Sequence, residues 1–129
     1  MEMEECPPEE EVLRAIRRAD WDKKKNRYSS GLFKGRDVSI SRLRILSYSE
    51  ILKIFRADFD DRPTGPLEGT GQINVGHLQK IGINYKANPT KLTVVPKPLE
   101  GNRAHAEIPQ NISKGLAREI IDALKVTPV

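Results

Sequence analysis

The sequence predicts an α+β fold, with a small, mainly antiparallel sheet packed by two or three short helices. Apolar and polar residues alternate with a period of two at 37–41 and again at 104–108, as in half-buried strands. Two other segments, beginning near residues 48 and 113, carry apolar residues at helical spacing behind serine caps. A chain of 129 residues suits one domain, which we expect over residues 11–129.

The N-terminal segment differs from the rest in composition. Residues 1–10 are acidic, include a pair of prolines and lack periodicity, so we expect a disordered tail. The apolar set that follows, Val12, Leu13 and Ile16, has helical spacing. A strand that enters the sheet is the alternative.

The first clear strand follows Asp37. Val38 and Ile40 lie on one face of it, and polar residues lie on the other. The apolar phase then shifts at Leu43, which predicts a β-bulge near residues 41–42.

Ser47 to Glu50 carries the clearest local pattern in the chain. Ser47 can accept a hydrogen bond from the amide of Glu50, whose carboxylate can accept from the amide of Ser47, as in a capping box. Leu46 and Ile51 occupy the positions of a hydrophobic staple. A helix is therefore predicted from Tyr48 to about residue 57.

Turn residues and caps outline the second half of the chain. Residues 58–71 hold two prolines, three glycines and four acidic residues, which predicts a surface loop. Asn74 and Ser113 are suited to cap two further helices. A β-rich run at 92–95 and the alternating run at 104–108 complete the predicted sheet.

Composition narrows the class of protein. No stretch reaches the ~18 uninterrupted apolar residues of a membrane helix, so we expect no membrane partner. Cys6 is the single cysteine, so an internal disulfide is excluded. We expect no metal and no cofactor, because Walker and Rossmann motifs are absent and no ligand spacing is diagnostic. The acidic start of the chain does not fit a signal peptide, so a cytoplasmic protein is expected.

Positive charge is concentrated in one part of the chain. The net charge is +4, but residues 14–44 hold eleven Lys or Arg and three Asp. Such a block is typical of proteins that bind phosphate-rich partners, and a solvated surface is the simpler interpretation. The candidate nucleic-acid-binding residues are Lys23, Lys24, Lys25 and Arg36.

A glycine- and serine-containing segment at 27–35 is the second candidate. Arg27, Ser29, Ser30 and Lys34 can present cations, hydroxyls and amides to a phosphate group. The alternative is a turn whose glycines serve backbone geometry alone.

An ionisable pair on the later strand is the third candidate. His105 and Glu107 point to the same face, whereas Ala104 and Ala106 are expected to face the core. If this strand and the one after Asp37 share a sheet, Asp37, His105 and Glu107 can meet as catalytic residues for acid–base chemistry. The alternative is that both members of the pair are ordinary solvent-facing residues.

Three of these segments together resemble a family of small uncharacterised prokaryotic proteins. They cover residues 12–16, residues 27–34 with 37–39, and residues 104–108. The resemblance implies no particular activity, fold or cofactor. It singles out the following positions: Arg27, Ser29, Ser30, Phe33, Asp37, Ser39 and His105.

Three functions are compatible with these patterns. The leading hypothesis is a binding module for nucleic acid or another phosphorylated ligand, which uses the basic segment as a cationic face. The first alternative is a small hydrolase or nuclease-like enzyme with His105 as acid and base. The second is an adaptor subunit whose basic face docks an acidic protein partner.

Overall fold

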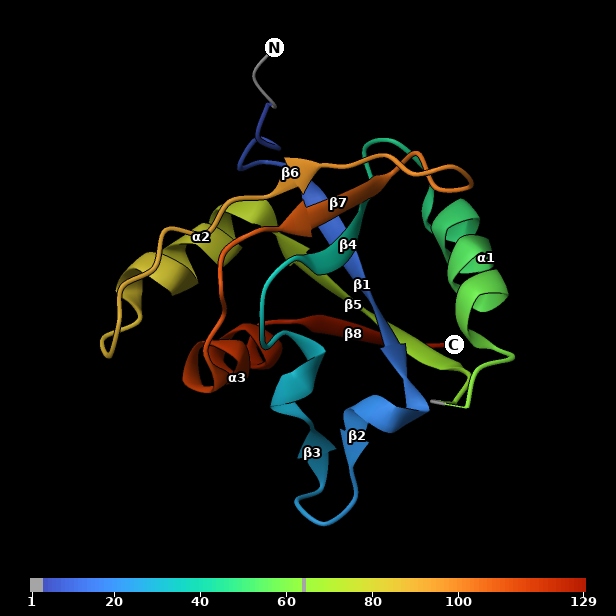
Figure 1. The fold of residues 1–129 in the computed structure, drawn as a ribbon, viewed down its shortest axis with the longest axis horizontal. Helices are drawn as coiled ribbons and strands as arrows, with labels where there is room; N and C mark the ends of the chain where they lie inside the picture. The colour runs from blue at the N-terminus through green and yellow to red at the C-terminus, as the bar shows by residue number, and fades with distance from the viewer. Residues whose placement is uncertain (1–3, 64) are drawn as a thin grey trace.

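A six-stranded antiparallel sheet forms the centre of the molecule in the computed structural model, which describes residues 4–63 and 65–129 (Figure 1). Its strands, in spatial order, are β6 (Val95–Pro96), β7 (His105–Ile108), β4 (Val38–Arg42), β1 (Glu11–Arg17), β5 (Leu67–Asn74) and β8 (Lys125–Pro128). A separate hairpin consists of β2 (Trp21–Asp22) and β3 (Arg27–Tyr28). The helices are α1 (Tyr48–Phe59), α2 (Val75–Asn84) and α3 (Lys114–Asp122). The predicted α+β class is confirmed, and no helix of the described residues is long and apolar enough to cross a membrane.

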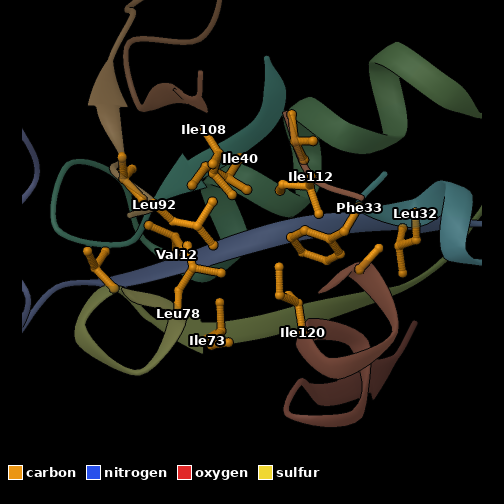
Figure 2. Packing of buried hydrophobic residues seen from close by; sticks show 14 of the residues in the cluster. Val12, Leu32, Phe33, Ile40, Ile73, Leu78, Leu92, Ile108, Ile112 and Ile120 are labelled. Carbon is orange, nitrogen blue, oxygen red and sulfur yellow. The ribbon is translucent and has the colours of Figure 1, made fainter. Parts of the chain in front are cut away.

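The sheet is covered on both faces, and each face has its own core. The residues of α2 and α3 pack in the larger cluster, which includes Val12 and Ile16 of β1. Figure 2 shows Val12, Leu78 of α2 and Ile120 of α3 within this cluster. Helix α1 packs in the smaller cluster, together with Leu13 and Ala15 of the same strand. Because β1 is buried on both faces, its four apolar residues occur in adjacent pairs and do not alternate, a spacing that also fits a helix. Of the two structures considered for this segment, the strand is the one formed.

Local capping signals predicted the starts of the three helices. Ser47 Oγ accepts a hydrogen bond from the Glu50 amide at 3.2 Å, and Glu50 Oε1 accepts one from the Ser47 amide at 3.1 Å, which confirms the capping box. Asn74 caps α2 through the His77 amide, and Ser113 caps α3 through the Leu116 amide. These side chains satisfy amides that have no partner within the helix.

The predicted loop over 58–71 is wrong in its second half, because β5 begins at Leu67. The glycines that indicated a loop serve close packing of the strand instead. A Cβ at Gly69 would lie 2.9 Å from the carbonyl oxygen of Thr127, and one at Gly71 would lie 2.8 Å from Leu124. The C-terminal segment, including β8, can lie against β5 only because these positions lack side chains.

Two smaller predictions near the strands also differ from the structure. No bulge interrupts the pairing at 41–42, because β4 ends at Arg42 and the chain turns there. The apolar phase shift at Leu43 therefore marks the end of the strand. Ala106 faces the larger core as predicted, but Ala104 precedes β7 in a turn and packs in the smaller core with α1.

The segment expected to be a disordered tail over residues 1–10 makes defined contacts between Cys6 and Glu10, and residues 1–3 lie outside the described part of the chain. Cys6 is 2% exposed, and its amide donates to the carbonyl oxygen of Val94. Glu10 accepts two hydrogen bonds of 2.7 Å from Arg42. The ion pair between Glu10 and Arg42 thus holds this acidic segment against the central sheet, although its composition predicted disorder.

Candidate functional site

The hairpin of β2 and β3 extends away from the six-stranded sheet (Figure 1). Its turn is held by Asp22, whose Oδ1 accepts from the amides of Lys24 at 3.0 Å and Lys25 at 3.2 Å. Trp21 and Tyr28 face each other across the two strands, with ring centroids 5.0 Å apart and planes at 82°. Such an edge-to-face pair stabilises a hairpin that is too short to be stable by its backbone bonds alone.

The tip of this hairpin is strongly cationic. Lys23, Lys24 and Lys25 are adjacent in the turn and all three are exposed. In the described residues, none of them has a carboxylate oxygen within 4.0 Å. Their charges therefore remain available to a partner.

A small cavity lies where the hairpin meets α3. Its volume is about 160 Å³, which is several times the ~30 Å³ that a water molecule occupies in the liquid. The lining residues are Asp22, Lys25, Arg27, Tyr28, Ser29, Ser30, Lys114 and Arg118. We call this cavity the cationic pocket. Four of its eight residues are basic and one is acidic, so its charge favours an anion.

The hydrogen bonds around the cationic pocket explain why this charge is not neutralised. Asp22 is already engaged with two amides of the turn. Arg118 donates through one guanidinium nitrogen to the carbonyl oxygen of Tyr28, which joins α3 to the hairpin. Among the described side chains, no carboxylate lies within ion-pair distance of Lys25, Arg27, Lys114 or Arg118. A phosphate group is the kind of anion that such a set of donors binds.

The serines add hydroxyl groups to the wall of the cationic pocket. Ser29 Oγ accepts from the amide of Gly31 at 3.2 Å and caps the 3₁₀ helix Ser30–Leu32. Its hydroxyl hydrogen is thereby left to donate to a ligand. The segment is thus a turn with a structural cap, and it also contributes to a concave polar surface.

Part of this site was predicted from the sequence. Arg27, Ser29 and Ser30 line one pocket, together with Lys25 from the basic run. Lys34 and Arg36 are exposed but are not among the residues that line it.

Lys114 and Arg118, which lie one helical turn apart on α3, were not predicted as part of the site. Their i, i+4 spacing indicates a shared helix face. Nothing local indicates that this face meets the hairpin.

The candidate catalytic residues are arranged differently from the predicted trio. Strands β4 and β7 are neighbours, as expected, and their register pairs Ser41 with His105 and Ser39 with Glu107. Asp37 lies before β4 with a positive φ of 55° and is not opposite His105. The structure therefore brings His105 and Glu107 beside two serines, and it does not bring Asp37 to His105.

A hydrogen bond and an ion pair, both with Lys97, hold the two members of the ionisable pair. His105 Nδ1 lies 2.9 Å from the carbonyl oxygen of Lys97, which can only accept, so Nδ1 carries a proton. Glu107 forms an ion pair of 3.3 Å with the Lys97 side chain. His105 lines a second cavity under α1, which does not contain Arg27.

No metal centre is found among the described residues, because they contain no group of three His, Cys, Asp or Glu side chains placed to hold an ion. The comparisons with protein-family models, curated proteins and solved structures returned no match to this chain. The resemblance to small prokaryotic proteins therefore stays a prediction, and functional inference rests on the geometry of the two cavities.

Proposed function

We propose that the protein binds the phosphate backbone of nucleic acid through the hairpin and the adjoining face of α3. The observation that carries this proposal is the cationic pocket, where Lys25 and Arg27 of the hairpin meet Lys114 and Arg118 of α3. No carboxylate of the described residues lies within ion-pair distance of these four cations. Phosphate contacts of this kind provide affinity with little sequence preference.

The extent of the charged surface favours a polymer over a single phosphorylated metabolite. The cationic pocket accommodates one anionic group, and Lys23 and Lys24 continue the positive charge along the hairpin tip beyond it. A chain of phosphates can contact both parts at once, whereas a small ligand contacts only the pocket. Binding of this type releases counterions and weakens steeply as salt is added.

The first test neutralises the hairpin tip. The variant Lys23→Gln/Lys24→Gln/Lys25→Gln is expected to bind a labelled single-stranded RNA or DNA more weakly in fluorescence anisotropy titrations. The slope of log K against log salt is expected to become shallower by about 0.7 for each phosphate of a single strand that the variant no longer neutralises. Unchanged affinity with an unchanged slope would exclude these lysines from the interface.

The second test addresses the cationic pocket. Arg27→Gln/Lys114→Gln removes one cation from each of its two walls, and Lys53→Gln/Lys80→Gln removes the same total charge from exposed positions on α1 and α2. The pocket variant is expected to lose affinity, and the control is expected to bind as the unmodified protein does. Equal losses would show that net charge, and not the cationic pocket, determines binding.

Two alternatives have defined outcomes in the same titrations. Absence of binding by the unmodified protein at low salt would reject the nucleic-acid proposal. Tighter binding of an acidic peptide than of nucleic acid, with the same dependence on Arg27 and Lys114, would instead support an adaptor that docks an acidic protein. Cleavage of the RNA or DNA that is lost in His105→Ala would support the hydrolase.

A further inference from the structure

The second cavity lies under α1, at a place where the central sheet opens. The pairing between β1 and β4 consists of Val12 with Arg42 and Leu13 with Ser41, and it stops there. Beyond this point, a cleft of about 320 Å³ lies between the diverging strands and α1. Its size suits a small organic molecule.

Arg14 fills the opening between the two strands. Its Nε donates to the carbonyl oxygen of Leu32 at 3.0 Å, and one of its terminal nitrogens donates to the carbonyl oxygen of Ser39 at 3.0 Å. A guanidinium has five N–H donors, so three remain after these two bonds. The Arg14 side chain starts on the face of β1 that carries Val12 and Ile16, and its guanidinium lies 5.9 Å from the centre of the Phe33 ring. Arg14 is also among the residues that line the cleft.

The positive charge of Arg14 has no close counterion. Among the described residues, no carboxylate oxygen lies within 4.0 Å of it. Burial lowers the pKa of the guanidinium, and the more distant Asp20 carboxylate opposes that shift. A half-buried cation without a counterion is unfavourable, and an anion bound in the cleft would supply the missing charge.

The two sides of the cleft differ in polarity. Helix α1 contributes the apolar side chains Ile54, Phe55 and Phe59, and the exposed Leu99 extends this wall toward the mouth. The sheet side contributes His105, whose Nδ1 is engaged with a backbone carbonyl oxygen. Its Nε2 has no hydrogen-bond partner among the described residues, which leaves it free for a ligand.

Polar groups next to His105 complete the sheet side. Asn102 Nδ2 donates to Ser41 Oγ at 3.3 Å, and both residues line the cleft. The Arg42 amide donates to the carbonyl oxygen of Ala104. The neighbouring residues Ser41 and His105 are therefore a non-hydrogen-bonded pair of the antiparallel ladder, the type of pair in which opposite side chains approach most closely. The hydrogen-bonding groups are thus concentrated opposite the apolar wall.

Two carboxylates restrict the charge that a ligand can carry. Asp58, at the end of α1, and Glu100, in the turn before β7, are exposed and line the same cleft. Like charges at short range are unfavourable, so these groups oppose a ligand with more than one negative charge. One anionic group beside Arg14 remains compatible with them.

We propose that this cleft binds a small organic monocarboxylate, with its carboxylate beside Arg14 and its apolar body against Ile54, Phe55 and Phe59. This site is separate from the cationic pocket, and its test does not depend on nucleic-acid binding. The ligand would contact His105 through the free Nε2.

Benzoate is a suitable probe because it combines one carboxylate with a flat apolar ring. Benzamide has the same shape without the charge, and phenyl phosphate has a larger charge. Titration of each into the 15N-labelled protein, followed by amide chemical shifts, is expected to show benzoate binding more tightly than both others. The shifted amides are expected to include Ser39, Asn102 and His105, and the hairpin amides are expected to remain unchanged.

A matched pair of variants tests the location. Leu99→Glu places a carboxylate at the mouth of the cleft, and Ile83→Glu makes the same change on α2, where the side chain is 52% exposed against 53% for Leu99. Leu99→Glu is expected to raise the Kd of benzoate about tenfold, which is about 1.4 kcal/mol. Ile83→Glu is expected to leave it unchanged.

Three results would overturn the proposal. Benzamide binding as tightly as benzoate would show that Arg14 does not select an anion. Tighter binding of phenyl phosphate would assign the cleft to phosphate esters and not to monocarboxylates. An unchanged benzoate Kd in Leu99→Glu would show that the probe binds elsewhere.

Discussion

Two charged regions of the molecule differ in whether their charges are paired. Near the N-terminus, the Glu10 side chain is 1% exposed and that of Arg42 is 16% exposed, and the two form a two-pronged ion pair. In the hairpin, Lys25 and Arg27 are exposed and, within the described residues, have no carboxylate partner. The first region uses opposite charges to fix the chain, and the second keeps like charges together at an energetic cost.

This difference separates charges that serve the fold from charges that are available for binding. A buried ion pair is strongly destabilised when one partner is removed, because the other is left without solvent or counterion. Exposed cations contribute little to stability, so their removal changes mainly the interaction with a partner. Stability measurements therefore provide a direct test of the comparison.

The largest effect is expected for Arg42→Met. This change leaves the Glu10 carboxylate buried and unpaired, and it should lower the free energy of unfolding by about 3–5 kcal/mol. The double variant Glu10→Gln/Arg42→Met should lose less than the sum of the two single variants, since no lone charge remains. Urea denaturation measures these values, with Arg56→Met at an exposed position of α1 as control. A loss below about 1 kcal/mol in Arg42→Met, the size of an ordinary surface ion pair, would remove the contrast between the two regions.

The same ion pair is expected to make stability depend on acid pH. Hydrogen bonds from Arg42 hold the pKa of Glu10 below its ordinary value, although burial opposes them. The stabilisation is therefore present above the ordinary glutamate pKa of about 4.3 and is lost as the pH falls through the lower folded value. Between pH 7 and pH 3, the melting temperature of the unmodified protein should fall more than that of Glu10→Gln/Arg42→Met. Parallel pH profiles would contradict the assignment.

The burial of the same N-terminal segment is also expected to slow the alkylation of the Cys6 thiol. Burial, with the nearby Glu10 carboxylate, raises the pKa of the thiol from 9.0 to about 11. At pH 8 the reactive thiolate is then about a hundredfold scarcer than in an unfolded chain. Iodoacetamide should accordingly alkylate the native protein far more slowly than the urea-unfolded protein, with the rates followed by mass spectrometry. Equal rates would mean that the N-terminal segment detaches readily from the sheet.

The smallest effect on stability is expected in the hairpin. Lys23→Gln/Lys24→Gln/Lys25→Gln should change the free energy of unfolding by no more than about 0.5 kcal/mol, because surface substitutions of this kind rarely do more. Because the substitutions relieve repulsion between the three positive charges, any change is expected to be a slight increase in the free energy of unfolding. A loss of more than about 1 kcal/mol in the same urea experiment would show that these lysines support the fold.

The sequence alone determined the features that depend on residues three or four positions apart. The capping box of Ser47 and Glu50 and the caps at Asn74 and Ser113 are closed by hydrogen bonds to amides of the next turn. The alternation that predicted β4 and β7 reflects the two faces of one strand. In the candidate site, Arg27 and the nearby serines were predicted from the residue types within one short segment.

Only the tertiary structure decided which of these local features meet. Arg118 bonds the carbonyl oxygen of Tyr28 across 90 positions of sequence, and without that contact the cationic pocket would lack one of its walls. Likewise, Gly69 and Gly71 belong to a strand because the C-terminal segment lies against them. A hydrogen bond within one helical turn is fixed by neighbouring residues, whereas contacts between distant segments depend on how all the apolar faces are buried together.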